Sequence, residues 1–381
     1  MSKAFDTLDH KILLQKLFRY GIRGVSLDWF RSYLTDRLQY TEFRSESSQQ
    51  QLLTCGVPQG SILGPLLFLL YINDIVHLCN SCKPILFADD TNLIFNHTDL
   101  NELVNNVNRE LQILSNWFKV NKLSLNSDKT KVILFQSQSR ALPDNTSQSI
   151  YLEGQKIEQV SVQKFLGVYI DQLLNWRHHI SLKNNIISRN VGILSRLKNT
   201  VPPNILKTLY HSIILPHLSY GVVAWGGTCK KELNRMSVLQ RKAIRLIHLS
   251  KYNAHTGPLF RKLNALMVHD INKLQCCKLV LKKQQNQLHP NISRLFSPSC
   301  NLHSHNTRQA SNIRPPRKNK TLCKQLLSSK IANNWNNLPN TIKSNTNLSL
   351  STFSTRTKTY FISKYPASCS LINCYVCSNN N

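Results

Sequence analysis

Acidic residues are almost absent from the second part of this chain. After residue 171 only Glu232 and Asp270 remain, although the same stretch holds 31 lysines and arginines. Residues 1–171 carry 17 basic and 17 acidic residues, so the whole net charge of +29 lies beyond them. A neutral part joined to a strongly basic part predicts a working module beside a module that binds a polyanion, above all a nucleic acid. The alternative, a basic surface that meets only solvent, fits poorly with so few compensating acids.

Long hydrophobic runs are lacking as well. The apolar stretch at residues 62–76 is interrupted by Gly64, Pro65 and Asp74, so it is too short and too broken to span a bilayer. The chain opens with a charged segment that does not look like a signal peptide. Its eleven cysteines are odd in number and scattered, which favours reduced thiols over a disulfide framework. We therefore expect an intracellular protein, nuclear or cytoplasmic, with no membrane partner.

The order of helical and strand patterns predicts the domain organisation. Up to residue 171, helical patterns over residues 9–22, 26–34, 61–76 and 99–119 alternate with strand patterns, an α+β arrangement around a small sheet. Beyond residue 171 the patterns are helical. We predict domains at residues 1–171, 172–250 and 251–381, the last with a mobile segment at about residues 284–330 that is rich in Asn, Ser, Lys and Arg.

Two of these helices carry more detailed expectations. The second should begin with Ser26 as its N-cap and turn Leu27, Trp29, Phe30 and Leu34 inward. The third should begin near Ser61, and it is apolar on nearly all sides, which predicts burial within a core.

A pair of adjacent acids, Asp89 and Asp90, stands between two strand-like runs at residues 85–95. This pattern predicts a tight β-hairpin whose turn carries two carboxylates. Neighbouring like charges repel, and a divalent cation between them lowers the cost. The hairpin is therefore a candidate metal platform for phosphate chemistry. A solvated Asp–Asp turn would have the same local sequence, so the surrounding motifs must decide.

Five short motifs follow one another in a specific order: SKAFDTLDH at residues 2–10, GVPQGS at 56–61, FADD at 87–90, LSLN at 123–126 with Lys129 after it, and FLGV at 165–168. In this order and spacing the chain resembles the reverse transcriptase of non-LTR, LINE-type retrotransposons, and looks closest to jockey-like elements. The resemblance covers residues 1 to about 171 and continues more weakly beyond, for example at residues 215–221. It implies a polymerase palm, a small antiparallel sheet packed on helices, followed by a helical thumb and a basic C-terminal region.

The resemblance also implies an activity. A reverse transcriptase copies an RNA template onto a DNA primer from deoxynucleoside triphosphates, and two Mg²⁺ ions, or Mn²⁺, support the in-line attack on the α-phosphate. By this resemblance Asp89 and Asp90 would hold the metal ions. Lys129 would face the pyrophosphate as a proton donor or charge stabiliser, although a solvated lysine before a strand is an open alternative.

Further roles follow from the same resemblance. Phe5 would pack under the nucleotide sugar and disfavour a 2′-hydroxyl, and Gln59 and Gly60 would contact the template and the incoming nucleotide. The hairpin that grips the primer end would consist of Phe165, Leu166 and Gly167. A plain loop-to-helix junction and a plain hairpin remain the alternatives for these segments.

One helical stretch of the basic half should contact phosphates without reading sequence, with an affinity that falls steeply as salt rises. Its basic residues are Lys230, Lys231, Arg235, Arg241, Lys242 and Arg245. Trp225, Tyr252 and Trp335 could stack on bases, although a core role is expected for Trp225.

The chain departs from the family pattern at its start. The first metal-binding Asp of such enzymes lies five residues before the aromatic matched by Phe5, which falls before residue 1. Asp6 is no substitute, because it follows Phe5 directly and should point to the opposite side of a strand. The preceding fingers segments and an endonuclease domain are not found either. We expect an N-terminally truncated polymerase with little or no activity, on the order of 10³-fold slower or worse.

Other interpretations stay open. One is a non-catalytic RNA- or DNA-binding protein derived from a retrotransposon, and another is a protein like a group II intron maturase, whose palm uses similar motifs. Near the C-terminus Cys369, Cys374 and Cys377 are spaced like part of a zinc knuckle, but no fourth ligand follows them.

Overall fold

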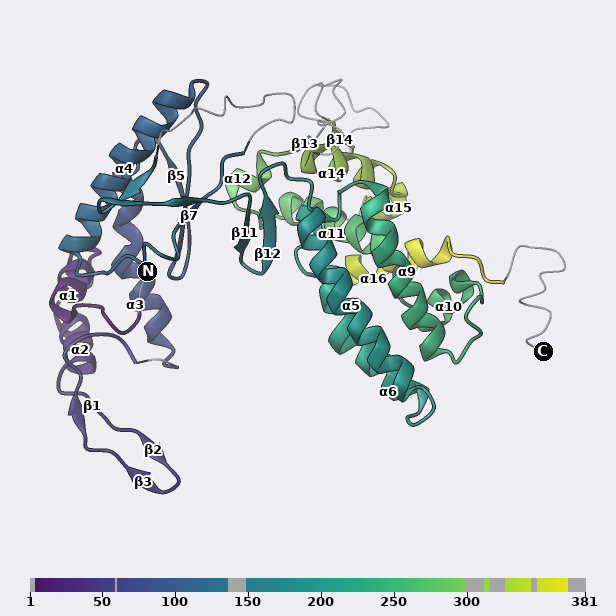
Figure 1. Cartoon of the computed structure of the whole chain (residues 1–381), viewed down its shortest axis with the longest axis horizontal. Helices are drawn as coiled ribbons and strands as arrows, with labels where there is room; N and C mark the ends of the chain where they lie inside the picture. The colour runs from purple at the N-terminus through teal and green to yellow at the C-terminus, as the bar shows by residue number, and fades with distance from the viewer. Residues whose placement is uncertain are drawn as a thin grey trace. The chain divides into compact units, whose positions relative to one another are not determined.

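The computed structural model describes residues 4–58, 60–135, 149–298, 312–315, 326–343 and 348–368 (Figure 1). The chain forms two compact units, Met1–Ser161 and Val162–Asn381, and each unit has its own hydrophobic core. These compact units do not test the expected domains at residues 1–171, 172–250 and 251–381, which stay predictions. No described helix is both long enough and apolar enough to cross a membrane.

Unit 1 (Met1–Ser161) is built on helices whose apolar stripes meet in one core. Its helices are α1 (His10–Arg19), α2 (Val25–Leu34), α3 (Leu63–Ile72), the 3₁₀ segment η1 (Asn73–Leu78) and α4 (Leu100–Val120). Leu13 and Leu17 of α1 are fully buried in the same hydrophobic cluster as Phe68 of α3 and Phe118 of α4. The spacing of these residues by three or four is what the helical period requires, so the predictions for α1 and α4 are confirmed.

Two details of the helix predictions are wrong. Helix α2 begins at Val25 after Gly24, not at Ser26, and Trp29 is 53% exposed because it lies on the side of α2 opposite Leu34. Helix α3 is not buried on all sides, since Leu66 is 51% exposed and no described segment covers that face.

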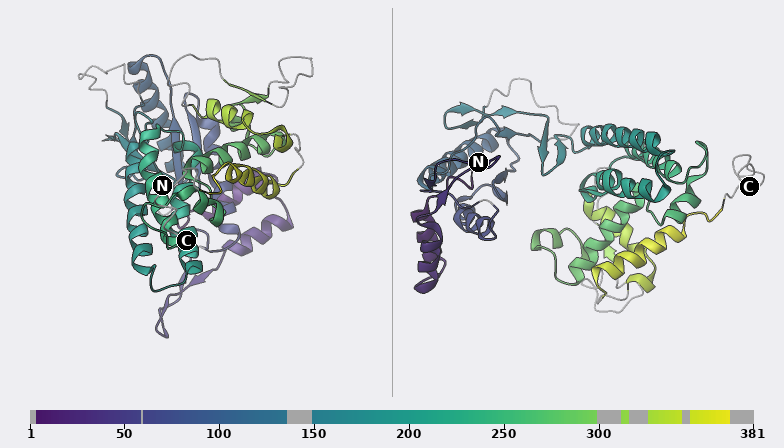
Figure 2. Two further views of the ribbon diagram at one scale, coloured as in Figure 1. Left: turned by 90° about the vertical axis from the view of Figure 1, so that its right-hand side faces the viewer. Right: turned by 90° about the horizontal axis from the view of Figure 1, so that it is seen from below.

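The strands of unit 1 form separate two-stranded ladders, where the sequence predicted one small antiparallel sheet. They are β1 (Leu38–Gln39) with β4 (Gln51–Leu52), β2 (Glu42–Phe43) with β3 (Glu46–Ser47), β5 (Lys83–Phe87) with β6 (Asp90–Ile94), β8 (Tyr151–Leu152) with β9 (Gln155–Lys156), and the parallel pair β7 (Lys131–Val132) and β10 (Glu158–Gln159). Most are only two residues long. The exposed β1–β4 segment projects away from the helices of its unit (Figures 1 and 2).

Unit 2 (Val162–Asn381) is a helical body that starts with one hairpin. The hairpin is β11 (Val162–Phe165) with β12 (Val168–Asp171). The longer helices are α5 (Arg177–Leu197), α9 (Lys230–Ile247), α11 (Val268–Gln284), α14 (Leu327–Asn336) and α16 (Leu350–Ser363). Shorter elements connect them: α6 (Pro203–Leu209), the π-helical η2 (Tyr210–Ile214), α7 (Leu215–Ser219), α8 (Val222–Trp225), α10 (Thr256–Leu263), α12 (Pro290–Ser293), β13 (Ser297–Pro298), β14 (Ile313–Arg314) and α15 (Asn340–Lys343).

A single core joins the expected thumb at 172–250 to the expected C-terminal region at 251–381. Gln240 of α9 is fully buried; its Nε2 donates to the carbonyl of Leu266 and its Oε1 accepts from the N–H of Val268, each at 2.9 Å. These bonds fasten the start of α11 to α9. Trp335 of α14 is also fully buried and stacks on Phe353, so it cannot stack on bases.

The expected mobile segment at residues 284–330 is described only in part, and the described part is structured. Within it, β13 pairs with β14, and the side-chain amide of Asn336 bonds both the N–H and the carbonyl of Ile313 at 2.8 Å. Ile313 is 3% exposed. Two hydrogen bonds from one side-chain amide therefore hold β14 against α14.

The β11–β12 hairpin is attached to α5 by contacts at the end of β12. The Asp171 carboxylate accepts N–H bonds from Leu173, Asn175 and Trp176 at 3.2, 3.0 and 2.7 Å, and so shapes the turn into α5. The N–H of Tyr169 donates to Nδ1 of the buried His179 on α5. The hairpin is therefore continuous with the helical unit.

Candidate active site

The two adjacent acids lie at the tip of the β5–β6 hairpin, as the sequence predicted. Phe87 pairs with Asp90, which leaves Ala88 and Asp89 as a two-residue turn. Ala88 has a φ of 48°, a conformation that costs a residue with a Cβ about 1–2 kcal/mol. Such strain persists only where the surrounding structure holds it, and it concentrates at functional sites.

The hairpin has an inner and an outer face. Leu86 and Leu93 pack against the core of unit 1, whereas Phe87 is 60% exposed and its partner Asp90 is exposed beside it. Asp89 in the turn is half-buried. Among the described residues neither carboxylate makes a hydrogen bond or a salt bridge, so both negative charges are uncompensated and can accept a hard cation.

No third ligand joins this pair within the described residues. The single group there of three His, Cys, Asp or Glu side chains close enough to share an ion lies elsewhere. Asp9 has another role, because its carboxylate caps α1 by accepting the N–H of Ile12 and pairs with Lys122 at 2.6 Å. Burial alone would raise the pKa of Asp9, but the hydrogen bonds from Lys122 and Ile12 outweigh it and hold the pKa below its usual value.

Two motifs that are fifty residues apart meet beneath α3. The N–H of Val57 donates to the carbonyl of Phe5 at 2.9 Å, and that of Gly56 to Leu8 at 2.8 Å. The Phe5 ring packs on Phe68 of α3 with ring centroids 4.6 Å apart. Gly56 has a φ of 85°, and a Cβ there would lie 2.8 Å from the carbonyl oxygen of Asp6. Only glycine allows this approach, so it positions Phe5.

A pocket of about 490 Å³ opens beside this junction, lined by Asp6, Arg37 and Gly56 among others. Gly60 is exposed with a φ of 82° and open space around it, and Gln59 lies outside the described residues. The hydroxyl of Ser61 accepts the N–H of Gly64 at 3.0 Å at the start of α3. The structure thus brings Phe5 and the glycine-containing segment together.

Lys129 lies in a turn before β7. Its N–H donates to Oδ1 of Asn126 at 3.0 Å, and the N–H of Thr130 donates to the carbonyl of Asn126 at 3.1 Å. This turn explains the asparagine of the Leu-Ser-Leu-Asn motif. The Lys129 side chain is exposed, and no contact with Asp89 or Asp90 appears among the described interactions.

The predicted primer-grip residues form the turn of the β11–β12 hairpin. Phe165 pairs with Val168, and the turn residues Leu166 and Gly167 both have positive φ, 45° and 81°. The hydroxyl of Tyr220 donates to the carbonyl of Leu166 at 2.6 Å, which holds the strained leucine in place. A Cβ on Gly221 would lie 2.9 Å from Val168. The segment at 215–221 therefore packs against this hairpin.

A family model described as reverse transcriptase (RNA-dependent DNA polymerase) matches residues 1–170, from the segment around Phe5 through the β11–β12 turn. Residues 1–170 belong to the reverse transcriptase family. Polymerases of this kind take a nucleic acid template and deoxynucleoside triphosphates and depend on divalent metal ions.

Three similar proteins come from Drosophila melanogaster. The chain is 30% identical over 283 residues to a probable RNA-directed DNA polymerase from transposon BS, 28% over 280 residues to one from transposon X-element, and 25% over 301 residues to the RNA-directed DNA polymerase from mobile element jockey. The matches cover 71%, 71% and 76% of this chain but 30%, 30% and 32% of those proteins. The chain thus spans about a third of these relatives, and the similarity is to LINE-type reverse transcriptases.

Unit 2, beyond the matched residues 1–170, contains the basic helix α9. At 100° per residue, Lys231, Arg235 and Lys242 lie within about 40° of one another, and all three are exposed. The opposite side, with Met236 and Gln240, is fully buried. This helix therefore presents a basic face to solvent, and the binding of nucleic acid by its residues stays a prediction.

The other basic residues of α9 differ from one another. Arg241 is exposed at the margin of this face, and the side chain of Lys230 is not among those described. Arg245 is half-buried, and its Nε donates to the carbonyl of Ala254 at 2.8 Å. Burial, with a smaller effect of Arg241, lowers the pKa of Arg245. Arg245 therefore has a structural contact that the sequence did not predict.

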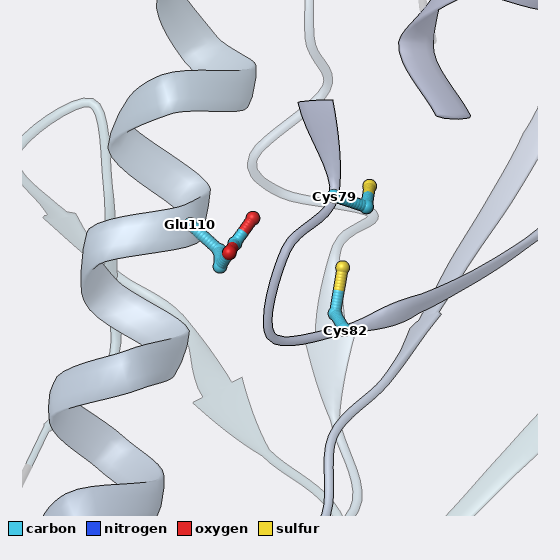
Figure 3. A group of neighbouring side chains, drawn as sticks. All are labelled: Cys79, Cys82 and Glu110. Carbon is cyan, nitrogen blue, oxygen red and sulfur yellow. The ribbon is translucent and has the colours of Figure 1, made fainter. Parts of the chain in front are cut away.

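Sequence reasoning missed one cluster, Cys79, Cys82 and Glu110, whose possible ligand atoms all lie within 4.8 Å of one another (Figure 3). The Cys-x-x-Cys spacing of Cys79 and Cys82 was a signal that could have pointed to it. Cys369, Cys374 and Cys377, the proposed knuckle, lie outside the described residues.

Proposed function

We propose that this chain is the polymerase part of a LINE-type RNA-directed DNA polymerase, with unit 1 as its palm and the helices of unit 2 as its thumb. The observation that carries the proposal is the β5–β6 hairpin, which holds a half-buried and an exposed carboxylate, both without a partner among the described residues, at its turn inside a reverse transcriptase domain. RNA would serve as template, DNA as primer and deoxynucleoside triphosphates as substrate.

Asp89 and Asp90 would hold the divalent ions, for which Mg²⁺ is the natural choice. Carboxylate oxygens, together with phosphate oxygens and water, are the ligands that Mg²⁺ takes, and both carboxylates are free of protein partners among the described contacts. The bound ions would lower the pKa of the primer 3′-hydroxyl and neutralise the leaving pyrophosphate. Lys129, exposed before β7, would add positive charge or a proton at the pyrophosphate.

The nucleotide would be positioned by the junction of Phe5 with the segment 56–60. Phe5 is held by a backbone bond to Val57 and by its contact with Phe68, so its ring has little freedom. A fixed ring can discriminate against a 2′-hydroxyl, because discrimination needs a surface that does not yield. Gly60, with open space around it, would let the template approach the backbone.

Primer extension tests this proposal. The full chain is assayed on poly(rA)/oligo(dT) with Mg²⁺ or Mn²⁺, beside Asp90→Asn and the control Asp28→Asn, an exposed acid that pairs with Arg31. In line with the low activity expected from the sequence, any extension should be weak; it should need metal, survive Asp28→Asn and fall below detection in Asp90→Asn. Extension at an unchanged rate in Asp90→Asn would refute the assignment of Asp90 as a metal ligand.

A second measurement does not depend on turnover. Fe²⁺ replaces Mg²⁺ at carboxylate sites and, with peroxide, cleaves the backbone near the bound ion. We expect cleavage around residues 87–91 that Mg²⁺ suppresses and that Asp90→Asn removes. Cleavage confined to other segments would contradict metal binding at this hairpin.

A second candidate function, nucleic acid binding without synthesis, is favoured by one observation. Among the described residues no third carboxylate joins Asp89 and Asp90, so these residues alone provide two of the ligands that a two-metal site uses. Tight duplex binding with no extension under any metal condition would support this alternative.

Binding itself is tested by the salt dependence of affinity. Each phosphate contact contributes about one to the slope of log K against log salt. Replacing Lys231, Arg235 and Lys242 together by glutamine should reduce the slope by about three. A matched triple variant on unit 1 serves as control: Lys11, Lys119 and Lys156, all exposed. Equal losses in both variants would show that the α9 face has no special role.

A further inference from the structure

Three side chains that can ligate a metal converge between η1, β5 and α4, away from the carboxylate hairpin. Cys79 follows η1, Cys82 directly precedes β5, and Glu110 extends from α4 toward the loop between them (Figure 3). Their ligand atoms all lie within 4.8 Å of one another. The cysteines are half-buried, and Glu110 is only 1% exposed.

The Glu110 carboxylate is incompletely satisfied. Its Oε1 accepts three hydrogen bonds: the N–H of Asn80 at 3.2 Å, the N–H of Ser81 at 2.8 Å and the hydroxyl of Ser81 at 2.9 Å. Its Oε2 is buried and has no hydrogen-bond partner in the described structure. No described lysine or arginine forms a salt bridge with it either. A buried carboxylate oxygen without partner or counter-charge is costly, and a bound cation removes that cost.

We propose that Cys79, Cys82 and Glu110 form a zinc site. Two sulfurs and one carboxylate oxygen are a ligand set for zinc, whereas Mg²⁺ and Ca²⁺ take oxygen ligands. Around a tetrahedral zinc ion with Zn–S bonds of about 2.3 Å, two sulfurs lie about 3.8 Å apart. Contraction from the present limit of 4.8 Å needs only small side-chain rotations. Water would complete the fourth position.

The position of the cluster indicates a structural role. Cys82 is the residue before β5, and β5 leads through Phe87 straight to the Ala88–Asp89 turn. A strand of five residues spans about 17 Å, so the zinc would lie far from the reacting phosphates. It would instead tie α4 to the base of the hairpin that carries Asp89 and Asp90. If Glu110 served only to cap the turn at Asn80 and Ser81, this would explain the bonds to its Oε1. It would not explain the unpartnered Oε2 or the two neighbouring thiols.

Zinc binding by the full chain is the experiment. Protein purified in reductant and dialysed against metal-free buffer is loaded with zinc, and bound metal is measured by mass spectrometry and by competition with a chromophoric chelator. Cobalt loading reports sulfur ligation through its thiolate charge-transfer absorption. We expect one tightly bound zinc ion per chain. The double variant Cys79→Ser/Cys82→Ser should lose this ion, and the control Cys55→Ser, which removes an exposed thiol, should retain it.

Glu110→Gln separates the ligand role from the structural role. Glutamine keeps a carbonyl oxygen to accept the bonds from Asn80 and Ser81, but it removes the negative charge. We expect zinc affinity to fall at least 10-fold with an unchanged circular dichroism spectrum. Unchanged affinity would remove Glu110 from the site and overturn the proposal.

A measurement on the unmodified chain guards against variants that fail to fold. Zinc should slow alkylation of Cys79 and Cys82, mapped peptide by peptide, and leave Cys55 unaffected. Three results would overturn the proposal. The first is that the chain binds no zinc ion tightly, and the second is that it loses its zinc only when Cys369, Cys374 and Cys377 are replaced. The third is a disulfide between Cys79 and Cys82 that persists in reductant.

Discussion

Replacing Gly56 by alanine tests how the segment carrying Phe5 is held in place. A Cβ at this position would lie 2.8 Å from the carbonyl oxygen of Asp6 and 2.9 Å from its Cα and carbonyl carbon. These are backbone atoms, which cannot rotate away as the end of a side chain can. The backbone of Gly56 also has a φ of 85°, which side chains with a Cβ rarely adopt.

Two costs add in the Gly56→Ala variant. The positive φ costs about 1–2 kcal/mol, and forcing a methyl group against packed backbone costs about 1–3 kcal/mol. Gly154 supplies a matched control, because its φ is 80° but nothing lies within 4 Å of the added Cβ. Gly154→Ala should therefore show only the first cost, and the difference between the variants isolates the close contact.

Hydrogen exchange read by mass spectrometry measures the effect locally, which matters because a chain of two compact units is not expected to unfold in a single transition. The amides of Gly56 and Val57, bonded to Leu8 and Phe5, should lose about 5- to 150-fold more protection in Gly56→Ala than the amides around residue 154 lose in Gly154→Ala. Equal losses would show that the contact with Asp6 contributes nothing, and the account of how Phe5 is positioned would fail.

Two further predictions concern unit 2. Tyr220→Phe removes the hydroxyl that bonds to Leu166 and should cost about 1 kcal/mol of local stability. Amide hydrogen exchange in residues 162–171 should therefore become about 5-fold faster. The control Tyr252→Phe, at a tyrosine that is 89% exposed, should leave exchange unchanged. Burial, helped by Lys183, lowers the pKa of His179 to about 4, so the unfolded chain binds the proton first as pH falls. Unit 2 should therefore lose about 3 kcal/mol of stability between pH 6.5 and pH 4, and urea titrations of His179→Gln should show a shallower loss over that window.

Local pattern predicted the elements of unit 1 well, because helix and hairpin periods are local properties. The stripe that contains Leu114 and Phe118 in α4 and the tight turn at Asp89 both follow from residues within a few positions of one another. Which side of an apolar helix is buried is not determined by neighbouring residues. Leu66 lies exposed on α3 although its sequence is as apolar as that of a core helix, since burial depends on segments elsewhere in the chain.

The candidate site divides in the same way. The Asp89–Asp90 hairpin and the basic face of α9 were predictable from neighbouring residues. The attachment of the β11–β12 hairpin to α5 was not, because Asp171 and Tyr169 make it through contacts with backbone groups and with His179 that leave no sequence pattern. The Cys79, Cys82 and Glu110 cluster needed a contact across about thirty residues, so only its Cys-x-x-Cys half was visible.

The difference in net charge between the two parts of the chain arises more from a shortage of acidic residues beyond residue 171 than from an excess of basic ones. Unit 2 retains three acidic residues, and each of them makes contacts that support the fold. Asp171 shapes the turn into α5, Glu232 pairs with Arg177 at 3.3 Å, and Asp270 accepts from Lys273 at 2.8 Å and from the Tyr365 hydroxyl at 2.6 Å.

Acids thus remain in unit 2 where the fold uses them and are missing elsewhere. The resulting field is a property of the whole unit and not of α9 alone, because every uncompensated lysine and arginine contributes to it. For this reason the triple variant on α9 should weaken nucleic acid binding and flatten its salt dependence without abolishing it. New acids placed on exposed positions of unit 2 should be as damaging as the removal of an equal number of bases, since long-range attraction depends on net charge.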